Sequence, residues 1–297
     1  PRPGGGFFQL LRRDMMDLAQ ELLAAVTGLA EEEELVRAAA VSGSLTDPAA
    51  IKDRFSDCDA VFFVRDLEEA RRRDYPSRLA PQFGGMLIMQ KPDEMDGGAS
   101  PWFTYLMQFD RGRIDLRLLP VERAAWYYGT EPGLTAVVDK DRLLDGLTPV
   151  GRKVFTLKRP DRTAYENCCN EFWWTTLYVA KGLARRQLDY AVWHLEHCVR
   201  PELIKMLVYD RGYPDYTVSL GVGNKYLPAL LSPKERQRWP ELYALGSPTD
   251  CARALRLAME WFLRVSCSAG EKLGIIAPDY GPAVAARCEA ILAEMGV

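Results

Sequence analysis

The stretch Ser56-Asp57-Cys58-Asp59-Ala60-Val61-Phe62-Phe63-Val64 decides how the first half of this chain folds. Its apolar part, Cys58–Val64, is rich in β-branched and aromatic residues, which predicts a buried β-strand. Asp57 and Asp59 stand at the start of that strand. Because side chains alternate between the two faces of a strand, both carboxylates point to the same side. A surface turn is the alternative interpretation of an Asp-x-Asp pair, so its meaning depends on the surrounding sequence.

Two hydroxyl groups and a glycine precede this strand. The short apolar segment Val36–Ser42 ends in Gly43-Ser44, and Ser56 comes directly before the paired carboxylates. A glycine lets backbone amides approach a phosphate closely, and a serine hydroxyl adds a hydrogen-bond donor. These residues therefore predict a phosphate-binding turn.

A third carboxylate lies further along the chain. Asp115 interrupts the apolar strand candidate Arg113–Leu119, where a charge is costly unless it is paired or ligates a metal. A strand-edge charge or one half of a salt bridge is the alternative. If the two strands are neighbours, Asp57, Asp59 and Asp115 converge. Magnesium prefers a few carboxylates together with phosphate and water, so the three predict a magnesium site for nucleotidyl transfer.

The rest of the chain predicts two domains of different class. A helix over 8–35 and two more strands, Gly85–Gln90 and Trp102–Phe109, with a loop over Pro92–Pro101, complete an α/β pattern. Beyond residue 150 the periodicity is helical. A capping box, Thr163-x-x-Glu166, predicts the start of a helix that runs to Arg200, ends before Pro201 and is weakened at Gly182. Further helical stretches cover 202–209, 226–231, 250–265 and 281–295.

The fold class is therefore α/β followed by α. The order of strand, Gly-Ser, Asp-x-Asp and a later lone Asp is typical of nucleotidyltransferases related to DNA polymerase β. We predict a polymerase-β-like nucleotidyltransferase domain with a mixed sheet over residues 1–155, and a helical-bundle domain over 156–297.

Several longer motifs are more specific than that signature. They are Leu87-Ile-Met-Gln-Lys-Pro-Asp-Glu94, Arg113-Ile-Asp-Leu116, Cys168-Cys-Asn-Glu-Phe-Trp-Trp174, Tyr178-Val-Ala-Lys-Gly182 and His194-Leu-Glu-His-Cys-Val-Arg-Pro201. From about residue 36 to the C-terminal helices, the chain resembles the aminoglycoside 6-adenylyltransferases. The resemblance implies transfer of AMP from ATP to a hydroxyl of an aminoglycoside such as streptomycin, which confers antibiotic resistance. It also implies an active site in the cleft between the domains.

The resemblance assigns roles to individual residues. Asp57 and Asp59 match metal-binding carboxylates, and Asp115 matches the third carboxylate, which is the general base for the acceptor hydroxyl. The expected nucleotide-binding residues are Gly43, Ser44, Ser56, Lys181, Lys225 and Tyr226.

Two positions depart from the family pattern. Leu45 stands where an arginine follows Gly-Ser, and Val222 stands where a lysine follows glycine. Lys225 or Lys181 are the candidates to compensate for the missing cations. The departures leave two alternatives open: a different nucleotide or acceptor, or a weakly catalytic homologue that binds a nucleotide or another ligand.

The acceptor is expected to contact a mixed stripe on the long helix. Glu171, Trp174, Tyr178, Lys181 and Arg185 recur at helical spacing and combine aromatic faces with charges. Aromatic faces attract cations and carboxylates pair with guanidinium groups, so Glu171, Trp174 and Tyr178 are substrate-binding candidates, with a half-buried helix edge as the alternative.

Other residues have weaker signals. Asp93 and Glu94, together with Asp96, could attract a polycation from the loop between two strands, but a solvated loop is the simpler interpretation. His194 and His197, the only histidines, are expected to be a structural pair, since their spacing is not that of a zinc protease.

Composition limits the class of partner. The formal net charge is −3, from 38 basic and 41 acidic residues, which disfavours nucleic-acid binding and favours a cationic small molecule. The seven cysteines form no Cys-x-x-Cys pair, as expected for reduced thiols in a cytoplasmic protein. No apolar run approaches the roughly 20 residues of a membrane span, and no signal-peptide pattern occurs. We therefore expect magnesium, ATP and an aminoglycoside as partners, and no membrane. The sequence leaves the oligomeric state open.

Overall fold

The computed structural model describes residues 5–47, 50–95, 100–151, 158–217 and 219–294, with side chains from residue 18 onward except that of Met95. The chain divides into two compact units, residues 1–154 and 155–297, and each is described by itself. The predicted domain boundary at 155/156 lies outside the described residues.

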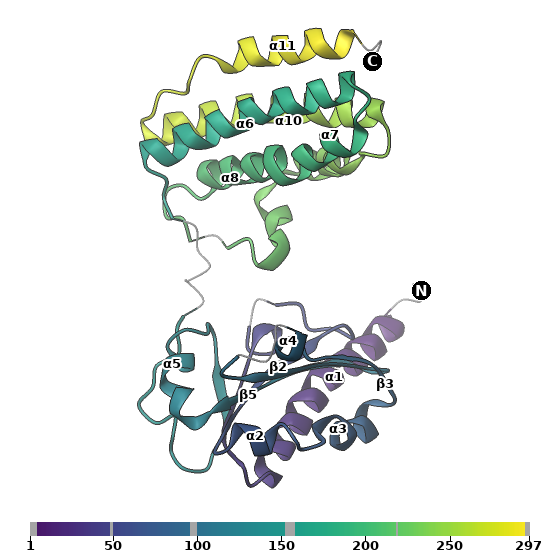
Figure 1. Cartoon of the computed structure of the whole chain (residues 1–297), viewed down its shortest axis with the longest axis vertical. Coiled ribbons are helices and arrows are strands. Elements are labelled where there is room, and N and C mark those ends of the chain that lie inside the picture. Colours follow the sequence, from purple (N-terminus) through teal and green to yellow (C-terminus); the bar gives the residue numbers. More distant parts are fainter. Residues whose placement is uncertain (1–4, 48–49, 96–99, 152–157, 218, 295–297) are drawn as a thin grey trace. The chain divides into compact units, whose positions relative to one another are not determined.

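Unit 1 is built on a mixed six-stranded sheet with the order β3-β4-β5-β2-β1-β6 (Figure 1). Strands β2 and β5 run parallel, while the other neighbours are antiparallel. The mixed sheet confirms the predicted α/β class. The strands are β1 (Val36–Ser42), β2 (Asp57–Val64), β3 (Met86–Gln90), β4 (Phe103–Phe109), β5 (Arg113–Pro120) and β6 (Thr135–Asp139).

Helices cover both faces of this sheet. They are α1 (Gly5–Glu32), α2 (Leu67–Ala70), α3 (Tyr75–Phe83), α4 (Pro92–Met95) and α5 (Ala124–Tyr128), with short 3₁₀ turns η1 (Gly43–Leu45) and η2 (Val121–Arg123). On α1, buried Leu18, Leu22 and Leu29 recur at helical spacing and pack on one face of the sheet, together with residues of α2 and α3 (Figure 1). The other face packs against Tyr127 and Tyr128 of α5.

Strand alternation divides β2 between these two cores. Cys58, Ala60 and Phe62 are buried on the α1 side, whereas Val61 and Phe63 belong to the core on the α5 side. Asp57 and Asp59 share the odd-numbered face, so they are carried on the α5 side of the sheet. A strand that is apolar on both faces is therefore what positions the two carboxylates.

Unit 2 consists of helices in the part of it that the structure describes. They are α6 (Arg162–Ala184), α7 (Leu188–His194), a π-helical turn η4 (Leu195–Val199), α8 (Arg200–Arg211), η5 (Val222–Asn224), η6 (Leu227–Leu230), α9 (Pro233–Arg238), η7 (Trp239–Tyr243), α10 (Pro248–Leu273) and α11 (Gly281–Ala293). Helices α6 and α10 lie between α8 and α11 in Figure 1. Their contact includes the rings of Phe172 and Phe262, whose centroids are 3.7 Å apart. The predicted helical domain is confirmed.

The long helix predicted from 163 to 200 is wrong in three details. It begins at Arg162, because Asp161 is the N-cap that accepts from the Ala164 N–H. It is interrupted between α6 and α7, where Arg186 has a φ of +60°. Gly182 does not cause that break, since a Cβ there would lie 2.8 Å from the Tyr190 ring, so glycine permits the close approach of α7. The helical path also continues through Pro201, following the π-turn η4.

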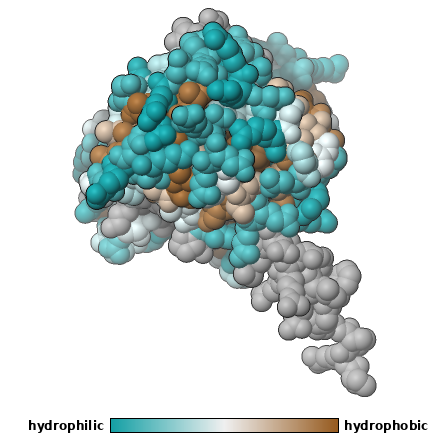
Figure 2. Space-filling view, turned by 90° about the horizontal axis from the view of Figure 1, so that it is seen from below, coloured by the Kyte–Doolittle hydropathy of each residue, from teal (hydrophilic) through white to brown (hydrophobic). Residues whose placement is uncertain are grey.

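Two other predictions of elements need correction. The predicted helix over 226–231 is only the 3₁₀ turn η6, and the predicted loop over 92–101 contains the helical turn α4. Strand β6 and helices α2 and α3 were not predicted. No helix in the described part of the chain is long and apolar enough to cross a membrane. On the face drawn in Figure 2, hydrophilic residues predominate and hydrophobic ones are scattered among them.

Candidate active site

The three predicted aspartates lie on two neighbouring parallel strands. In the register of β2 and β5, Asp59 stands opposite Asp115 and Asp57 stands opposite Arg113. Because paired residues of neighbouring strands point to the same face, the three carboxylates and the Arg113 guanidinium share one face of the sheet. All three aspartates are half-buried. The strand pairing on which their convergence depended is present.

The charge of these carboxylates is incompletely balanced. The pKa of Asp59 is raised to about 6 by burial and by the negative charges of Asp57 and Asp115, which outweigh the attraction of Arg113. A cation placed beside Asp59 would favour its ionised form. The group of like charges therefore has the electrostatics expected of a site that binds a divalent ion together with an anionic ligand.

Magnesium fits two of these carboxylates. Within the described ranges no three His, Cys, Asp or Glu side chains come close enough together to form a complete metal site. Magnesium, however, is often held by one or two carboxylates, with phosphate oxygens and water completing its shell. Asp57 and Asp59 provide that number. Asp115 as a third ligand stays a prediction.

The Gly-Ser turn lies directly against the two carboxylates of β2. Gly43 has a φ of +67°, and a Cβ at this position would lie 2.0 Å from Asp59 Oδ2. The Ser44 hydroxyl donates to Asp57 Oδ1 over 3.3 Å. Glycine is thus required twice here, for its backbone conformation and for the space that the Asp59 carboxylate occupies. Two motifs that are separated in the sequence form one structure.

Leu45 and Ser56 are both turned inward. Leu45 is partly buried and packs against the core on the α1 side of the sheet, so the residue after Gly-Ser has a structural role. Ser56 is buried, and its hydroxyl oxygen accepts from the Asp53 N–H over 2.9 Å. Ser56 therefore stabilises the turn that leads into Asp57.

Arg113 was not singled out from the sequence. Its Nε and Nη2 donate to the two oxygens of Asp115 over 2.8 and 2.6 Å, a bidentate pair that orients the carboxylate. The available signal was the spacing of Arg113 and Asp115, since residues two apart on a strand lie on the same face.

A cleft of about 730 Å³ opens beside Asp57 within unit 1. Arg54, Arg111 and Arg113 line it together with the exposed Phe55, whose ring centroid lies 4.7 Å from the Arg54 guanidinium carbon. Sequence reasoning missed this group of cations as well. Arginines beside carboxylates that could hold a cation are suited to binding phosphate groups.

The acidic residues of α4 differ from each other. Asp93 is buried, and its Oδ2 has no hydrogen-bond partner among the described residues, so the solvated interpretation is wrong for this residue. Glu94 is exposed and lies 3.7 Å from Arg71 and 3.9 Å from Lys91. Asp96 lies outside the described residues.

The remaining candidates belong to unit 2. On α6, Glu171, Trp174 and Lys181 are exposed, and the half-buried Tyr178 accepts a hydrogen bond of 2.7 Å from Trp174 Nε1. After η5, the Lys225 ammonium lies 5.2 Å from the centroid of the half-buried Tyr226 ring. Glu171, Trp174, Tyr178 and Lys181 share one helix, as the sequence pattern indicated, and the roles of all these residues stay predictions.

Comparison with known proteins adds an independent finding. A family model described as streptomycin adenylyltransferase matches residues 16–286. An aminoglycoside 6-adenylyltransferase of Bacillus subtilis (strain 168) is 30% identical over 278 residues, which cover 92% of this chain and 97% of the relative. The Staphylococcus aureus protein of that name is 30% identical over 262 residues, covering 85% of this chain and 92% of its own length.

A third relative and a solved structure are also similar to this chain. The aminoglycoside 6-adenylyltransferase of Campylobacter jejuni is 30% identical over 266 residues, covering 88% of this chain and 91% of the relative. The crystal structure of an aminoglycoside 6-adenyltransferase from Bacillus subtilis aligns with a TM-score of 0.46 at 27% identity, covering 92% of this chain and 98% of that one.

Proposed function

This chain belongs to the streptomycin adenylyltransferase family, and on that premise we propose that it transfers AMP from ATP to a hydroxyl of an aminoglycoside such as streptomycin, with magnesium as cofactor. In a bacterium, this reaction would confer resistance to the antibiotic.

One observation carries the proposal: Gly43 and Ser44 lie directly on the carboxylates of Asp59 and Asp57. A turn that approaches phosphates is thereby joined to carboxylates that hold a cation. Asp115 stands in register with Asp59 on the adjacent strand. A triphosphate bound at the turn would lie beside Asp57 and Asp59, with Asp115 on the adjacent strand.

The roles of the residues follow from this arrangement. Asp57 and Asp59 would hold magnesium, which when bound neutralises the charge of the triphosphate and orients it. The acceptor oxygen attacks the α-phosphorus in line, the bond from that phosphorus to the bridging oxygen of the β-phosphate breaks, and pyrophosphate leaves. Asp115, oriented by Arg113, accepts the proton of the acceptor hydroxyl.

Leu45 offers no positive charge to the phosphates, and the arginines of the cleft are the candidates to provide it. Arg54, Arg111 and Arg113 line the cleft beside Asp57, and we assign to them contacts with the phosphates, in addition to those expected from Lys181, Lys225 and Tyr226 of unit 2. A nucleotide other than ATP remains the second candidate. Leu45 and Val222 favour it, because neither side chain offers a cation to the triphosphate. Leu45 packs inward and Val222 is 81% exposed.

The acceptor contacts are assigned to the mixed stripe of α6. Glu171 provides a carboxylate, and Trp174 and Tyr178 provide aromatic faces, all of which suit the guanidinium and ammonium groups of an aminoglycoside.

A direct test is to mix the purified chain with magnesium, streptomycin and each of the four ribonucleoside triphosphates in turn, and to follow pyrophosphate release and the mass of the drug. We expect the drug to gain one AMP, and we expect Asp57→Ala to abolish the gain. A gain with another nucleotide only would establish the second candidate. No gain with any nucleotide would contradict the proposed function.

A further inference from the structure

Exposed and half-buried aromatic side chains gather on adjacent parts of α6, α7 and η4 in unit 2. We call them the aromatic row: Trp174, Tyr178, Tyr190, Trp193, His194 and His197. Trp174 is 58% exposed and Trp193 is 53% exposed, in a unit whose other large aromatic residues include the buried Phe172 and Trp261. Packing within unit 2 does not account for two tryptophans left in solvent, and exposed aromatic patches commonly mark binding surfaces.

The row is continuous from one helix to the other. Trp174 donates to the Tyr178 hydroxyl, and the centroid of the Tyr178 ring lies 5.2 Å from that of His194. The centroid of the His194 ring lies 4.2 Å from that of Tyr190 and 4.9 Å from that of Trp193. At the end of the row, the Trp193 and His197 rings are stacked at 4.9 Å with an interplanar angle of 15°. The row therefore presents one surface rather than separate side chains.

The two histidines contribute hydrogen-bond acceptors. Nδ1 of His194 lies 2.9 Å from the Tyr190 carbonyl oxygen, and Nδ1 of His197 lies 2.9 Å from the Trp193 carbonyl oxygen. Because a carbonyl only accepts, each Nδ1 donates, and in the neutral ring Nε2 is left as the acceptor. His197 lies on the π-turn η4, a conformation that occurs frequently at functional sites. A surface of aromatic faces and acceptors is suited to a ligand rich in N–H donors.

Carboxylates accompany the row. Glu171 lies one helical turn before Trp174 and is exposed, and no described residue forms an ion pair with it. Glu196 lies between the two histidines in sequence, is exposed, and stands 3.7 Å from Arg200. The combination of aromatic faces with carboxylates is the chemistry that binds guanidinium and ammonium groups.

From these contacts we infer that the acceptor surface extends from α6 onto α7, where Trp193 and His194 bind a guanidinium or ammonium group of the cationic acceptor. The inference rests on the proposed function for the identity of the ligand. It adds Tyr190, Trp193 and the two histidines to the acceptor contacts. The helical spacing on α6 predicted only residues of α6 itself.

The test is titration calorimetry of the full chain with streptomycin, without nucleotide or metal. Trp193→Ala is expected to weaken binding about fivefold, and Trp193→Leu about equally, because leucine restores apolar area but not the aromatic face. Trp193→Phe is expected to keep most of the affinity. Trp126→Ala is the matched control, since Trp126 is 48% exposed in unit 1 and is expected to leave the dissociation constant unchanged. Maltotriose, which carries no charge, is expected not to bind.

Three results would overturn the inference. They are dissociation constants of Trp193→Ala and Trp174→Ala within twofold of the parent, equal binding of maltotriose, and a change of oligomeric state in Trp193→Ala, which would assign the row to a second copy of the chain. Circular dichroism and thermal melting establish whether each variant folds.

The inference and the proposed function fail separately. Transfer of AMP by the parent chain, with unchanged streptomycin affinity in the Trp193 variants, would overturn the role of the row and keep the reaction. Binding that depends on Trp193 without any transfer would keep the row and overturn the reaction.

Discussion

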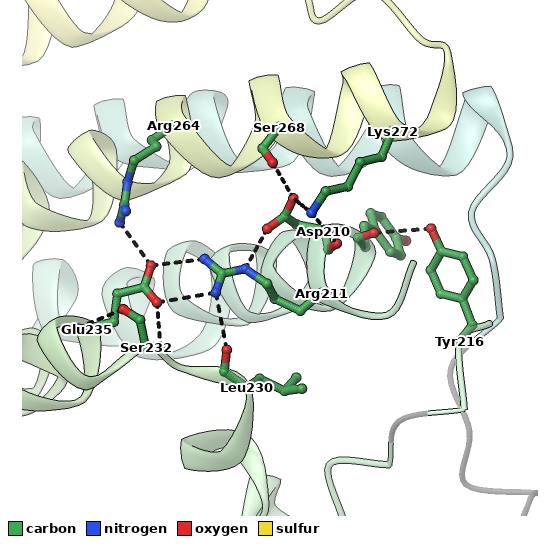
Figure 3. Close-up of polar contacts among 10 residues, drawn as sticks. Asp210, Arg211, Tyr216, Leu230, Ser232, Glu235, Arg264, Ser268 and Lys272 are labelled. Atoms are coloured by element: carbon green, nitrogen blue, oxygen red, sulfur yellow. Dashed lines mark hydrogen bonds and ion pairs between the residues drawn. The ribbon is translucent and has the colours of Figure 1, made fainter. Parts of the chain in front are cut away.

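Both units hold acidic side chains away from solvent, but they balance them in opposite ways. In unit 2, Asp210 and Glu235 are almost fully buried, and both carboxylates accept hydrogen bonds from several neighbours (Figure 3). The donors are Arg211, Ser232, Arg264, Ser268 and Lys272. In unit 1, Asp59 faces Asp57 and Asp115, which carry the same charge. The first arrangement stabilises a fold, whereas the second leaves negative charge for a cation to neutralise.

The charge network of unit 2 is complete. Asp210 accepts from Ser268 over 2.6 Å, from Lys272 over 2.7 Å and from Arg211 over 2.6 Å. Burial raises the pKa of Asp210, but these hydrogen bonds outweigh burial and lower it. Arg211 also donates to Glu235 over 3.0 Å and to the Leu230 carbonyl over 3.3 Å (Figure 3). The network thereby fixes both ends of the segment that carries Lys225 and Tyr226.

The largest expected effect is on activity at the unbalanced site. Asp59→Asn should lower kcat/KM by more than about 100-fold, because even the outer partners of a metal ligand are commonly worth 10- to 100-fold. The measurement is streptomycin-dependent pyrophosphate release. Glu122→Gln, which removes an exposed carboxylate of the same unit, is the control and should leave kcat/KM unchanged. Equal activities of the two variants would contradict the role of Asp59.

The balanced site should respond in stability instead. Asp210→Asn leaves Lys272 without its anion and Arg211 with Glu235 alone. Because both cations are partly exposed, we expect a loss of about 2–4 kcal/mol in the free energy of unfolding. Chemical denaturation measures this loss. Glu260→Gln, which breaks the exposed pair with Arg238, should cost less than about 1 kcal/mol. If the two losses were equal, the network would not be what stabilises unit 2.

The contact between Gly43 and Asp59 predicts an effect of intermediate size. Gly43→Ala forces both a positive φ and a clash with the carboxylate, so we expect a loss of about 2–3 kcal/mol. Gly146 separates the two causes, because it lies in unit 1 with a φ of +75° and nothing within 4 Å of an added Cβ. Gly146→Ala should therefore cost only about 1–2 kcal/mol. Equal losses in denaturation would show that the contact contributes nothing.

The next expected effect is a gain in stability and not a loss. Because the pKa of Asp59 is raised in the folded state to about 6, its ionisation opposes folding at neutral pH by up to about 2–3 kcal/mol. This cost disappears as the pH falls from about 6 to below the pKa of the unfolded state. Without metal, Asp59→Asn should thus be more stable than the parent at pH 7 and equally stable near pH 4.

Asp210 should show the reverse dependence on pH. Its pKa is lowered in the folded state, so its contribution is present above the pKa of the unfolded state and is lost as the pH falls through the folded value. Melting temperatures of parent, Asp59→Asn and Asp210→Asn between pH 4 and 8 check both signs. A stability difference that does not change with pH would contradict the account of either site.

Apolar runs and helical periodicity in the sequence predicted the strands and helices that have such patterns. Strands β2, β4 and β5 are short apolar runs, and α10 and α11 are periodic over several turns. Strand β6 was not predicted because it is an edge strand with mainly exposed or half-buried residues. Helix α3 was not predicted because it contains Pro76 and Pro81. Neither feature gives a strong apolar period.

The candidate site also contains residues that the sequence predicted and residues that it did not. The proximity of Gly43, Ser44, Asp57 and Asp59 depends on two adjacent strands, and Asp115 depends on one more pairing, so the order of motifs in the sequence was sufficient. The cations of the cleft come from two separate segments, since Arg54 precedes β2 whereas Arg111 and Arg113 lie at the start of β5. The burial of Asp93 depends on how a short helical turn packs. Such features depend on side-chain packing between distant segments, which no local pattern records.

The central claim, that a divalent cation neutralises the carboxylates of β2, is tested most directly by calorimetric melting with magnesium and a non-hydrolysable ATP analogue. The account predicts that the two ligands together raise the melting temperature of the parent, and that Asp59→Asn starts higher and gains nothing on their addition. An equal increase in both proteins would contradict it.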